Sequence, residues 1–501
     1  MNMSNSSNRT IGLFVGCPDA VVNNVKTRIN PNNPDVSPVV RDGRVLVPLR
    51  YVAECFGAKV DWDEATSTIR IALERKVAAM TVGSKKCNLL YSEVELEAPL
   101  QIINGAAMVP LRTFADVFDK YVFSDSRGLV VVSDLTGSDL IDEYIGRFMT
   151  YEKVSIGGAM ASEVGYYGTC PESPDGSKIA YVVYDEKPPE NSFPSGSLYI
   201  CNSDLTDHKK IRDIASISWH DGACVLWIDN NTLAYMDKAR GNETYIINTN
   251  GDVLYGPIQG YIGHGDIPNG LLPLMVDKRT FPNGSNLGPN GVYVFKDGVV
   301  TQVADLKKDI GQLKPRLAGG KNPDDWYIYH AQFSTDGTYM AIRLDTGIPL
   351  KEKYLISFKS DGTDIRLFEW NYLHQQWYDD STVYGHDCDW NEKPMFQAKR
   401  WDRDSNCIEI LAGVGNHMGI SPDRKYFVSE TQYLTNPVVM RLYRVGNTTP
   451  LAILMSEPAG FIWDMRTHVN PSFSRDGKKV YFNKPVGDTI HVYRADISNI
   501  I

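Results

Sequence analysis

The sequence predicts a mostly β protein with two regions, a small α+β region followed by a seven-bladed β-propeller. Three observations support this fold class: the length, a repeat near the N-terminus, and a turn motif that recurs through the rest of the chain. At roughly 100–200 residues per domain, 501 residues correspond to more than one domain. We place the boundary near residue 136, which separates residues 1–136 from residues 137–501.

The first region consists of two copies of one pattern, with the second copy starting 62 residues after the first (Gly43 to Gly105). The two copies are expected at about residues 10–73 and 77–134. Asp42-Gly43 and Asn104-Gly105 predict tight hairpin turns. In each copy a Val-Pro-Leu-Arg stretch follows and predicts a short helix, since proline is tolerated in a first helical turn. Residues 11–16 are therefore expected to form the first strand of copy one and not a signal segment.

The second region carries a Ser-x-Asp turn at Ser173, Ser334, Ser421 and Ser474, each before a β-rich run. A tight turn followed by alternating strands is typical of a four-stranded propeller blade. Weaker units at about 225–248, 271–296 and 394–411 bring the prediction to seven blades, with six blades as the alternative. Residues 143–156 are expected to supply the strand that closes the ring.

Charge and composition exclude several functions. A formal net charge of −10 argues against a nucleic-acid partner, because phosphate binding needs a basic face. No apolar run reaches the length of a transmembrane segment. The eight cysteines contain no Cys-x-x-Cys pair and fit a reducing compartment. A cytoplasmic location is expected if the chain is complete as given, with the cell surface or secretion as the alternative.

Histidines recur at one position of the predicted blades. Four residues before the turn serine, at the start of the innermost strand, stand Thr169, His330, His417 and Asn470. Aligning Trp390 with the serine in the fifth blade places His386 at the same position. His468 shares a strand face with Asn470. Because innermost strands line the central channel, these imidazoles are expected to converge at one mouth, where they could bind a metal or transfer protons.

The first region resembles the copper amine oxidase N-terminal repeat, a stalk domain of bacterial surface proteins. The resemblance covers about residues 10–135 and implies a spacer or docking module. The chain lacks the Asn-Tyr-Asp/Glu-Tyr cofactor precursor and the His-x-His pair of the catalytic domain of those oxidases. We therefore expect neither copper nor a quinone cofactor.

The stretch from Thr467 to Val480 resembles the last blade of oligogalacturonate lyases, and the turns are shared with TolB-like propellers. This resemblance implies a divalent metal, manganese in that family, held at positions Met465, His468, Asn470 and His417. Met465 and Asn470 depart from the family residues, which puts manganese in question. The resemblance also implies a catalytic His386 and a catalytic cation near Lys353 or Tyr354.

The function predicted from these residues is β-elimination of a uronate-containing oligosaccharide. Removing the C5 proton needs a base near neutrality, and neutralising the adjacent carboxylate, with a metal or with Arg343 or Lys353, stabilises the transition state. Substrate contacts are expected from His330, Trp370, Trp377 and Trp390, with Trp370 and Trp377 exposed. The alternative is a non-catalytic propeller that binds a glycan or a protein partner. No Gly-x-Ser-x-Gly elbow supports a peptidase.

Overall fold

The structure is a computed structural model. It describes residues 8–137, 140–156, 161–186, 193–218, 222–239, 242–316, 322–346, 353–368, 372–387, 397–431, 436–458 and 468–501. The chain divides into two compact units, one of residues Met1–Thr150 and Thr449–Pro458 and the other of residues Tyr151–Thr448 and Ala459–Ile501.

The first unit contains three antiparallel sheets. One has the order β13-β14-β1-β2-β3, with strands Tyr121–Ser124, Leu129–Ser133, Thr10–Phe14, Asp19–Val22 and Val25–Arg28. The second has the order β10-β9-β8-β7-β6, with strands Glu93–Glu95, Lys86–Leu89, Lys76–Thr81, Thr68–Leu73 and Lys59–Asp63. The third has the order β11-β12-β5-β4, with strands Gln101–Ile103, Ala106–Pro110, Arg44–Pro48 and Val39–Arg41. The helices are α1 (Leu49–Cys55), α2 (Leu111–Phe118) and α3 (Leu140–Phe148).

The repeat predicted from the sequence is confirmed in this unit. In each copy a hairpin turn with positive φ precedes the strand that ends in Val-Pro, and the helix begins directly after that proline. The two Val-Pro strands, β5 and β12, pair with each other, so Val47 lies directly opposite Val109. Both valines are fully buried in one apolar core to which both copies contribute. The two copies therefore form one folded unit.

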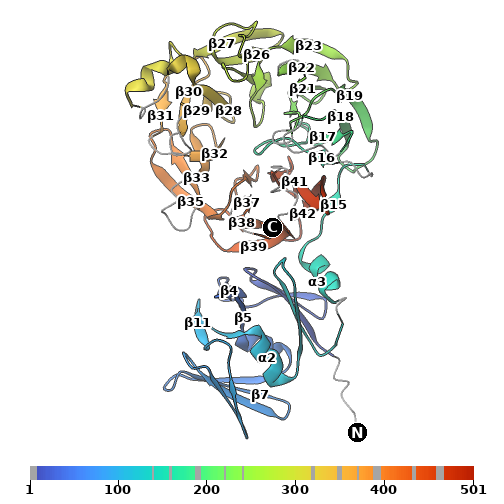
Figure 1. The fold of residues 1–501 in the computed structure, drawn as a ribbon, viewed down its shortest axis with the longest axis vertical. Coiled ribbons are helices and arrows are strands. Elements are labelled where there is room, and N and C mark those ends of the chain that lie inside the picture. The colour runs from blue at the N-terminus through green and yellow to red at the C-terminus, as the bar shows by residue number, and fades with distance from the viewer. Residues whose placement is uncertain are drawn as a thin grey trace. The chain divides into compact units, whose positions relative to one another are not determined.

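The strands from β15 to β42 form seven four-stranded antiparallel sheets, which confirms the seven-bladed propeller (Figure 1). The first three blades are β16–β19 (Ser162–Glu163, Lys178–Tyr184, Gly196–Asn202, Lys209–Ile214), β20–β23 (Leu226–Trp227, Thr232–Asp237, Glu243–Asn248, Val253–Ile258) and β24–β27 (Tyr261–Ile262, Leu272–Val276, Gly291–Lys296, Val299–Asp305). The next three are β28–β31 (Tyr327–Phe333, Tyr339–Asp345, Lys353–Lys359, Arg366–Leu367), β32–β35 (Tyr372–Trp377, Thr382–Asp387, Gln397–Asp402, Cys407–Val414) and β36–β39 (Met418–Ile420, Tyr426–Glu430, Val438–Arg444, Pro450–Glu457). Blade seven comprises β40 (Ser472–Phe473), β41 (Lys479–Val486), β42 (Thr489–Asp496) and β15 (Glu152–Lys153). The short 3-10 helices are η1 (Pro268–Gly270), η2 (Ile310–Arg316) and η3 (Pro323–Asp325).

The Ser-x-Asp turns form because their side chains satisfy the backbone locally. In the first blade the Ser173 hydroxyl donates to Asp175 and accepts the backbone N–H of Lys178, at 2.6 and 3.0 Å. The same pair of bonds recurs at Ser334, Ser421 and Ser474. These hydrogen bonds hold the pKa of the Asp175 carboxyl at about 2. Each turn fixes the register of the two innermost strands of its blade.

Strand β15 closes the ring, as the sequence predicts. It pairs with β42, and the Arg494 guanidinium contacts the Glu152 carboxylate at 2.7 Å. A second link joins blades seven and one through the buried Glu172 carboxylate. That carboxylate accepts the backbone N–H of Arg475 at 2.7 Å and the hydroxyl of Tyr481 at 2.6 Å.

We predict that limited proteolysis releases a stable propeller fragment that retains Ile501 and begins between residues 136 and 151. Such a fragment keeps β15 and therefore all four strands of blade seven. Mass spectrometry of the protected fragment identifies its first residue. Protection only of fragments that begin after Lys153, without the closing strand, would contradict the prediction.

Candidate functional site

Three residues of the innermost propeller segments have a left-handed backbone conformation. His330, His374 and Asn470 each lie four residues before the turn of their blade and have positive φ, between 47° and 53°. In β28 and β32 the pairing with the next strand shifts across this position, which marks a β-bulge. A bulge removes one residue from the ladder and redirects its side chain. Histidine and asparagine are among the residues that tolerate this backbone conformation.

His386 does not lie on an innermost strand, so that part of the sequence prediction is wrong. It lies on β33, the second strand of blade five, and His374 on β32 holds the innermost position. The turn of this blade is built by Asp379, whose carboxylate accepts the backbone N–H groups of Ser381 and Thr382 at 2.9 and 2.8 Å. Tyr378 takes the place of the turn serine in this blade, so the alignment of Trp390 with the turn serines was out of register.

The structure brings six histidines together with two tyrosines. His417 lies 4.2 Å from His468 and 4.3 Å from His374 between ring centroids, and His264 lies 4.9 Å from His330. Tyr166 and Tyr167 follow β16 of blade one. Their rings lie between 4.9 and 6.0 Å from those of five of the histidines: His264, His330, His374, His417 and His468. We call these six histidines, of which His386 is the sixth, and the two tyrosines the channel cluster. Blades one and three to seven all contribute to it.

His417 is held by a buried carboxylate. Its Nδ1 lies 2.6 Å from the Oε1 of Glu430, both side chains are fully buried, and its backbone N–H donates to the same oxygen at 3.1 Å. Because a carboxylate accepts, the proton of this bond is on Nδ1, and Nε2 carries the lone pair. A carboxylate that orients a histidine in this way is typical of metal-binding and of catalytic imidazoles.

His374 and His386 form a hydrogen-bonded pair. His374 Nδ1 lies 2.9 Å from His386 Nε2, so one ring donates and the other accepts. Burial lowers the pKa of His374 well below its usual value, and His417, His386 and the Arg343 guanidinium lower it further. His374 is therefore neutral near pH 7. Arg343, predicted as a cationic group of the site, is close enough to act on His374 electrostatically.

Tyr167 joins blade one to blade four through a short hydrogen bond, with 2.5 Å between its hydroxyl oxygen and His330 Nδ1. His330 is only partly buried, whereas Tyr167 is fully buried. The tyrosine hydroxyl can therefore move a proton to or from a ring that reaches solvent.

Three of the four predicted metal ligands, His417, His468 and Asn470, have side chains suited to a divalent ion. His417 and His468 are close together, and Asn470 follows on the same segment as His468. The Asn470 amide is buried, and neither of its polar atoms has a hydrogen-bond partner among the described residues. Buried amides are normally hydrogen-bonded, so the Asn470 amide is suited to binding an ion or another ligand. Met465 lies outside the described residues. In the part of the chain that the structure describes, no three His, Cys, Asp or Glu side chains are arranged to hold an ion.

The other predicted residues lie apart from the channel cluster or cannot be placed. Lys353 begins β30, the third strand of its blade, and its side chain lies outside the described part. Tyr354 packs against the apolar core between blades. Trp370 and Trp390 lie outside the described residues. The prediction that Trp377 is exposed is wrong: it is 6 % exposed, stacks on Tyr339 and donates its indole N–H to the Gln332 carbonyl.

Sequence reasoning missed His264, His374, Tyr166, Tyr167 and Glu430. Glu430 could have been found, because the Ser421 turn fixes a register that pairs Met418 with Ser429 and so places Glu430 opposite His417. His374 lies four residues before Tyr378, which takes the place of the turn serine in its blade. The tyrosines follow an innermost strand that carries no such spacing signal.

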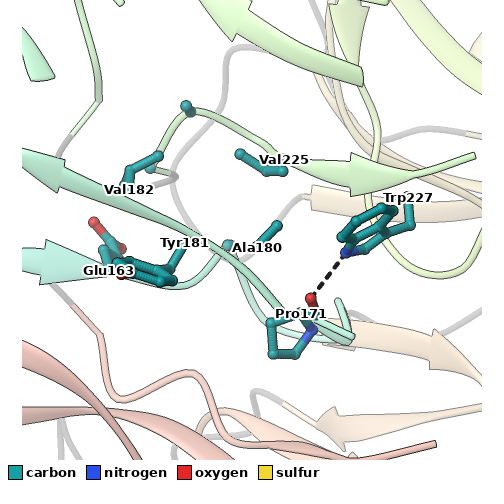
Figure 2. A pocket seen from close by; sticks show the side chains of 10 residues that line it. Glu163, Pro171, Ala180, Tyr181, Val182, Val225 and Trp227 are labelled. Atoms are coloured by element: carbon teal, nitrogen blue, oxygen red, sulfur yellow. Dashed lines mark hydrogen bonds between the residues drawn. The ribbon is translucent and has the colours of Figure 1, made fainter. Parts of the chain in front are cut away.

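A small enclosed cavity lies elsewhere, between blades one and two (Figure 2). Its volume is about 10 Å³, room for a single water. Glu163, Val182 and Val225 line it, beside Trp227, whose indole N–H donates to the Pro171 carbonyl at 2.9 Å. The cavity is too small for a sugar and is no substrate site.

The lowered pKa of His374 predicts that acid destabilises the fold. Above pH 6.5 the histidine is neutral in both states. As the pH falls below 6.5, the unfolded chain binds a proton that folded His374 refuses, so the free energy of unfolding decreases. His491, whose pKa burial lowers to about 4, acts in the same direction. The urea midpoint should be lower at pH 5.5 than at pH 7.5, and less so in His374→Gln. A midpoint that rises on acidification would contradict this.

The fold and the cluster define a seven-bladed propeller with a histidine-rich channel, preceded by two α+β repeats. A family model described as the copper amine oxidase N-terminal domain matches residues 21–132, which confirms the resemblance of the first region. None of the curated proteins compared with the chain matches it.

Solved structures similar to this chain include an oligogalacturonate lyase in complex with manganese. It is 15 % identical with a TM-score of 0.47, and the match covers 70 % of this chain and 96 % of that one. An oligogalacturonate lyase from Vibrio parahaemolyticus is 11 % identical, with a TM-score of 0.47 and coverage of 75 % and 96 %. TolB from Acinetobacter baumannii is 10 % identical, with a TM-score of 0.32 and coverage of 88 % and 78 %. No helix among the described residues is long and apolar enough to cross a membrane.

Proposed function

We propose that the propeller is a lyase that binds a uronate-containing oligosaccharide at the channel and cleaves it by β-elimination. The observation that carries this proposal is the hydrogen-bonded His374–His386 pair, whose His374 ring is neutral and lies near the buried Arg343. Elimination needs both of these groups, a base and a cation.

Different residues at the channel serve different steps of the elimination. The His374–His386 pair takes the C5 proton of the uronate, with His374 on the innermost strand and His386 behind it. Arg343 faces the negative charge that develops on the carboxylate. As the C4–O bond breaks and the C4–C5 double bond forms, the departing oxygen takes a proton, for which the Tyr167 hydroxyl is the candidate donor.

A divalent ion at His417, His468 and Asn470 would neutralise the uronate carboxylate as a Lewis acid. Within that site Glu430 fixes the ring of His417 so that Nε2 is available. Two imidazoles with an amide oxygen suit zinc, nickel or cobalt as well as manganese. Addition of each ion to metal-free protein, followed by thermal unfolding, tests which one binds.

The second candidate is a non-catalytic propeller that binds a glycan or a protein partner. The burial of the imidazoles favours it, since His386, His417 and His468 are fully buried. Paired calorimetry and turnover measurements on a panel of oligouronates separate the two candidates. Binding with formation of an ultraviolet-absorbing unsaturated product supports the lyase, whereas binding without product supports the second candidate.

A further inference from the structure

The connection after β25 of blade three is fixed against the innermost strand of blade four. The buried Asp277 carboxylate accepts the backbone N–H and the hydroxyl of Thr280 at 2.8 and 2.9 Å. Its second oxygen accepts the backbone N–H of Ile328 on β28 at 2.9 Å. These bonds fix the backbone of the turn that carries Arg279.

Arg279 is exposed at the end of this turn and lies beside two tyrosines of β28. Its guanidinium carbon is 5.6 Å from the ring centre of Tyr327 and 5.5 Å from that of Tyr329. The guanidinium also donates to the Tyr329 hydroxyl. Arginine stacked on aromatic rings loses little freedom when it binds a carboxylate, and its planar fork binds both oxygens of that group.

This arrangement lies at the end of the channel from which β28 starts, next to the channel cluster. β25 ends and β28 begins there, and the Tyr329 ring lies 5.9 Å from the ring of His330. Arg343 is opposite Tyr329 across the β28–β29 ladder, so the two share a face of the sheet. A tyrosine thus stands between an exposed arginine and a buried one.

The charges nearby leave Arg279 available to an anion. In the part of the chain that the structure describes, no carboxylate lies within salt-bridge distance of its guanidinium. Asp277 is occupied by the three donors of the turn and of β28. Asp345, also on this face, is buried and lies opposite Tyr327 and Lys353 in the backbone register. The neighbouring Lys278 is paired with Asp325 at 2.8 Å.

We infer that Arg279, Tyr327 and Tyr329 form a second subsite, which binds the carboxylate and ring face of a uronate next to the one that is cleaved. The inference rests on the proposed function and extends it, because consecutive uronates carry one carboxylate per sugar. Arg343 serves the sugar at the cluster and Arg279 the neighbour nearer to solvent. The subsite selects oligomers of at least two charged sugars over single uronates.

Calorimetry of the intact protein with a tri-uronate and with its carboxyl-reduced neutral analogue tests the subsite. Arg279→Ala should weaken binding of the acidic trimer about tenfold, the loss of a charged hydrogen-bonding partner at an exposed site, and leave the neutral analogue unchanged. Arg279→Lys should bind the acidic trimer with an affinity between those of the unsubstituted protein and of Arg279→Ala. Lys278→Ala, the matched control, should leave both affinities within about twofold.

The outcomes separate this inference from the proposed function. If the unsubstituted protein binds the acidic trimer and Arg279→Ala binds it equally well, the subsite is wrong and the proposed function stands. An equal loss for the acidic and neutral trimers also overturns the subsite, because the contact is then not one of charge. If the unsubstituted protein binds no oligouronate, both are overturned.

Discussion

Replacing His386 with alanine should lower the rate of elimination about 10²–10⁴-fold at saturating substrate, the usual cost of losing a general base. KM should change little, because the proton-accepting pair acts in the transition state. His374→Ala should have an effect of the same size, since each ring holds the other at 2.9 Å. The measurement is kcat from the absorbance of the unsaturated product.

Two variants control that experiment. His208→Ala removes a histidine that is bonded to Tyr181 outside the channel cluster, and it should keep full turnover. His386→Gln keeps a hydrogen-bonding group for His374 but cannot take up the proton, so it should fold like the unsubstituted protein and remain inactive. Full turnover by His386→Gln would remove the pair from the mechanism.

Replacing Trp377 with alanine should destabilise the propeller by about 3–5 kcal/mol, as expected for truncation of a large buried aromatic side chain. The indole packs with Phe368, Val383 and Trp401 and also loses its bond to the Gln332 carbonyl. Chemical denaturation followed by circular dichroism measures the change.

Trp62→Ala in the first unit is the matched control, because Trp62 is 41 % exposed. Trp62→Ala should lower the free energy of unfolding by much less than Trp377→Ala does. A Trp377 variant that retains its stability but loses affinity for oligouronates would instead restore the sequence prediction that this tryptophan contacts substrate.

The repeats and the blades could be predicted because their signals are local. The Ser-x-Asp turns close hydrogen bonds within five residues, and the Val-Pro-Leu-Arg stretch recurs in both copies. The fifth blade lacked that signal, because the Asp379 carboxylate alone closes its turn. His386 was consequently assigned to the wrong strand, and His374 was overlooked.

The candidate site was only partly predictable, because it depends on contacts between blades. The spacing that marks the innermost strands led to His330, His417 and His468, which the structure brings into one cluster. Tyr167 meets His330 across 163 positions of the chain, and no short-range pattern reports such a contact. Trp377 was misjudged for a similar reason: its exposure is decided by the neighbouring blade, which supplies the Gln332 carbonyl.

The most direct test of the lyase proposal is the ultraviolet absorbance of unsaturated uronate ends during incubation of the intact protein with oligouronates, in the presence of manganese, zinc, nickel or cobalt. We predict a steady rise with at least one oligouronate, and its loss in His386→Gln. No rise with any oligouronate and any of these ions, while calorimetry shows that the sugars bind, would contradict the account and assign the channel cluster to binding alone.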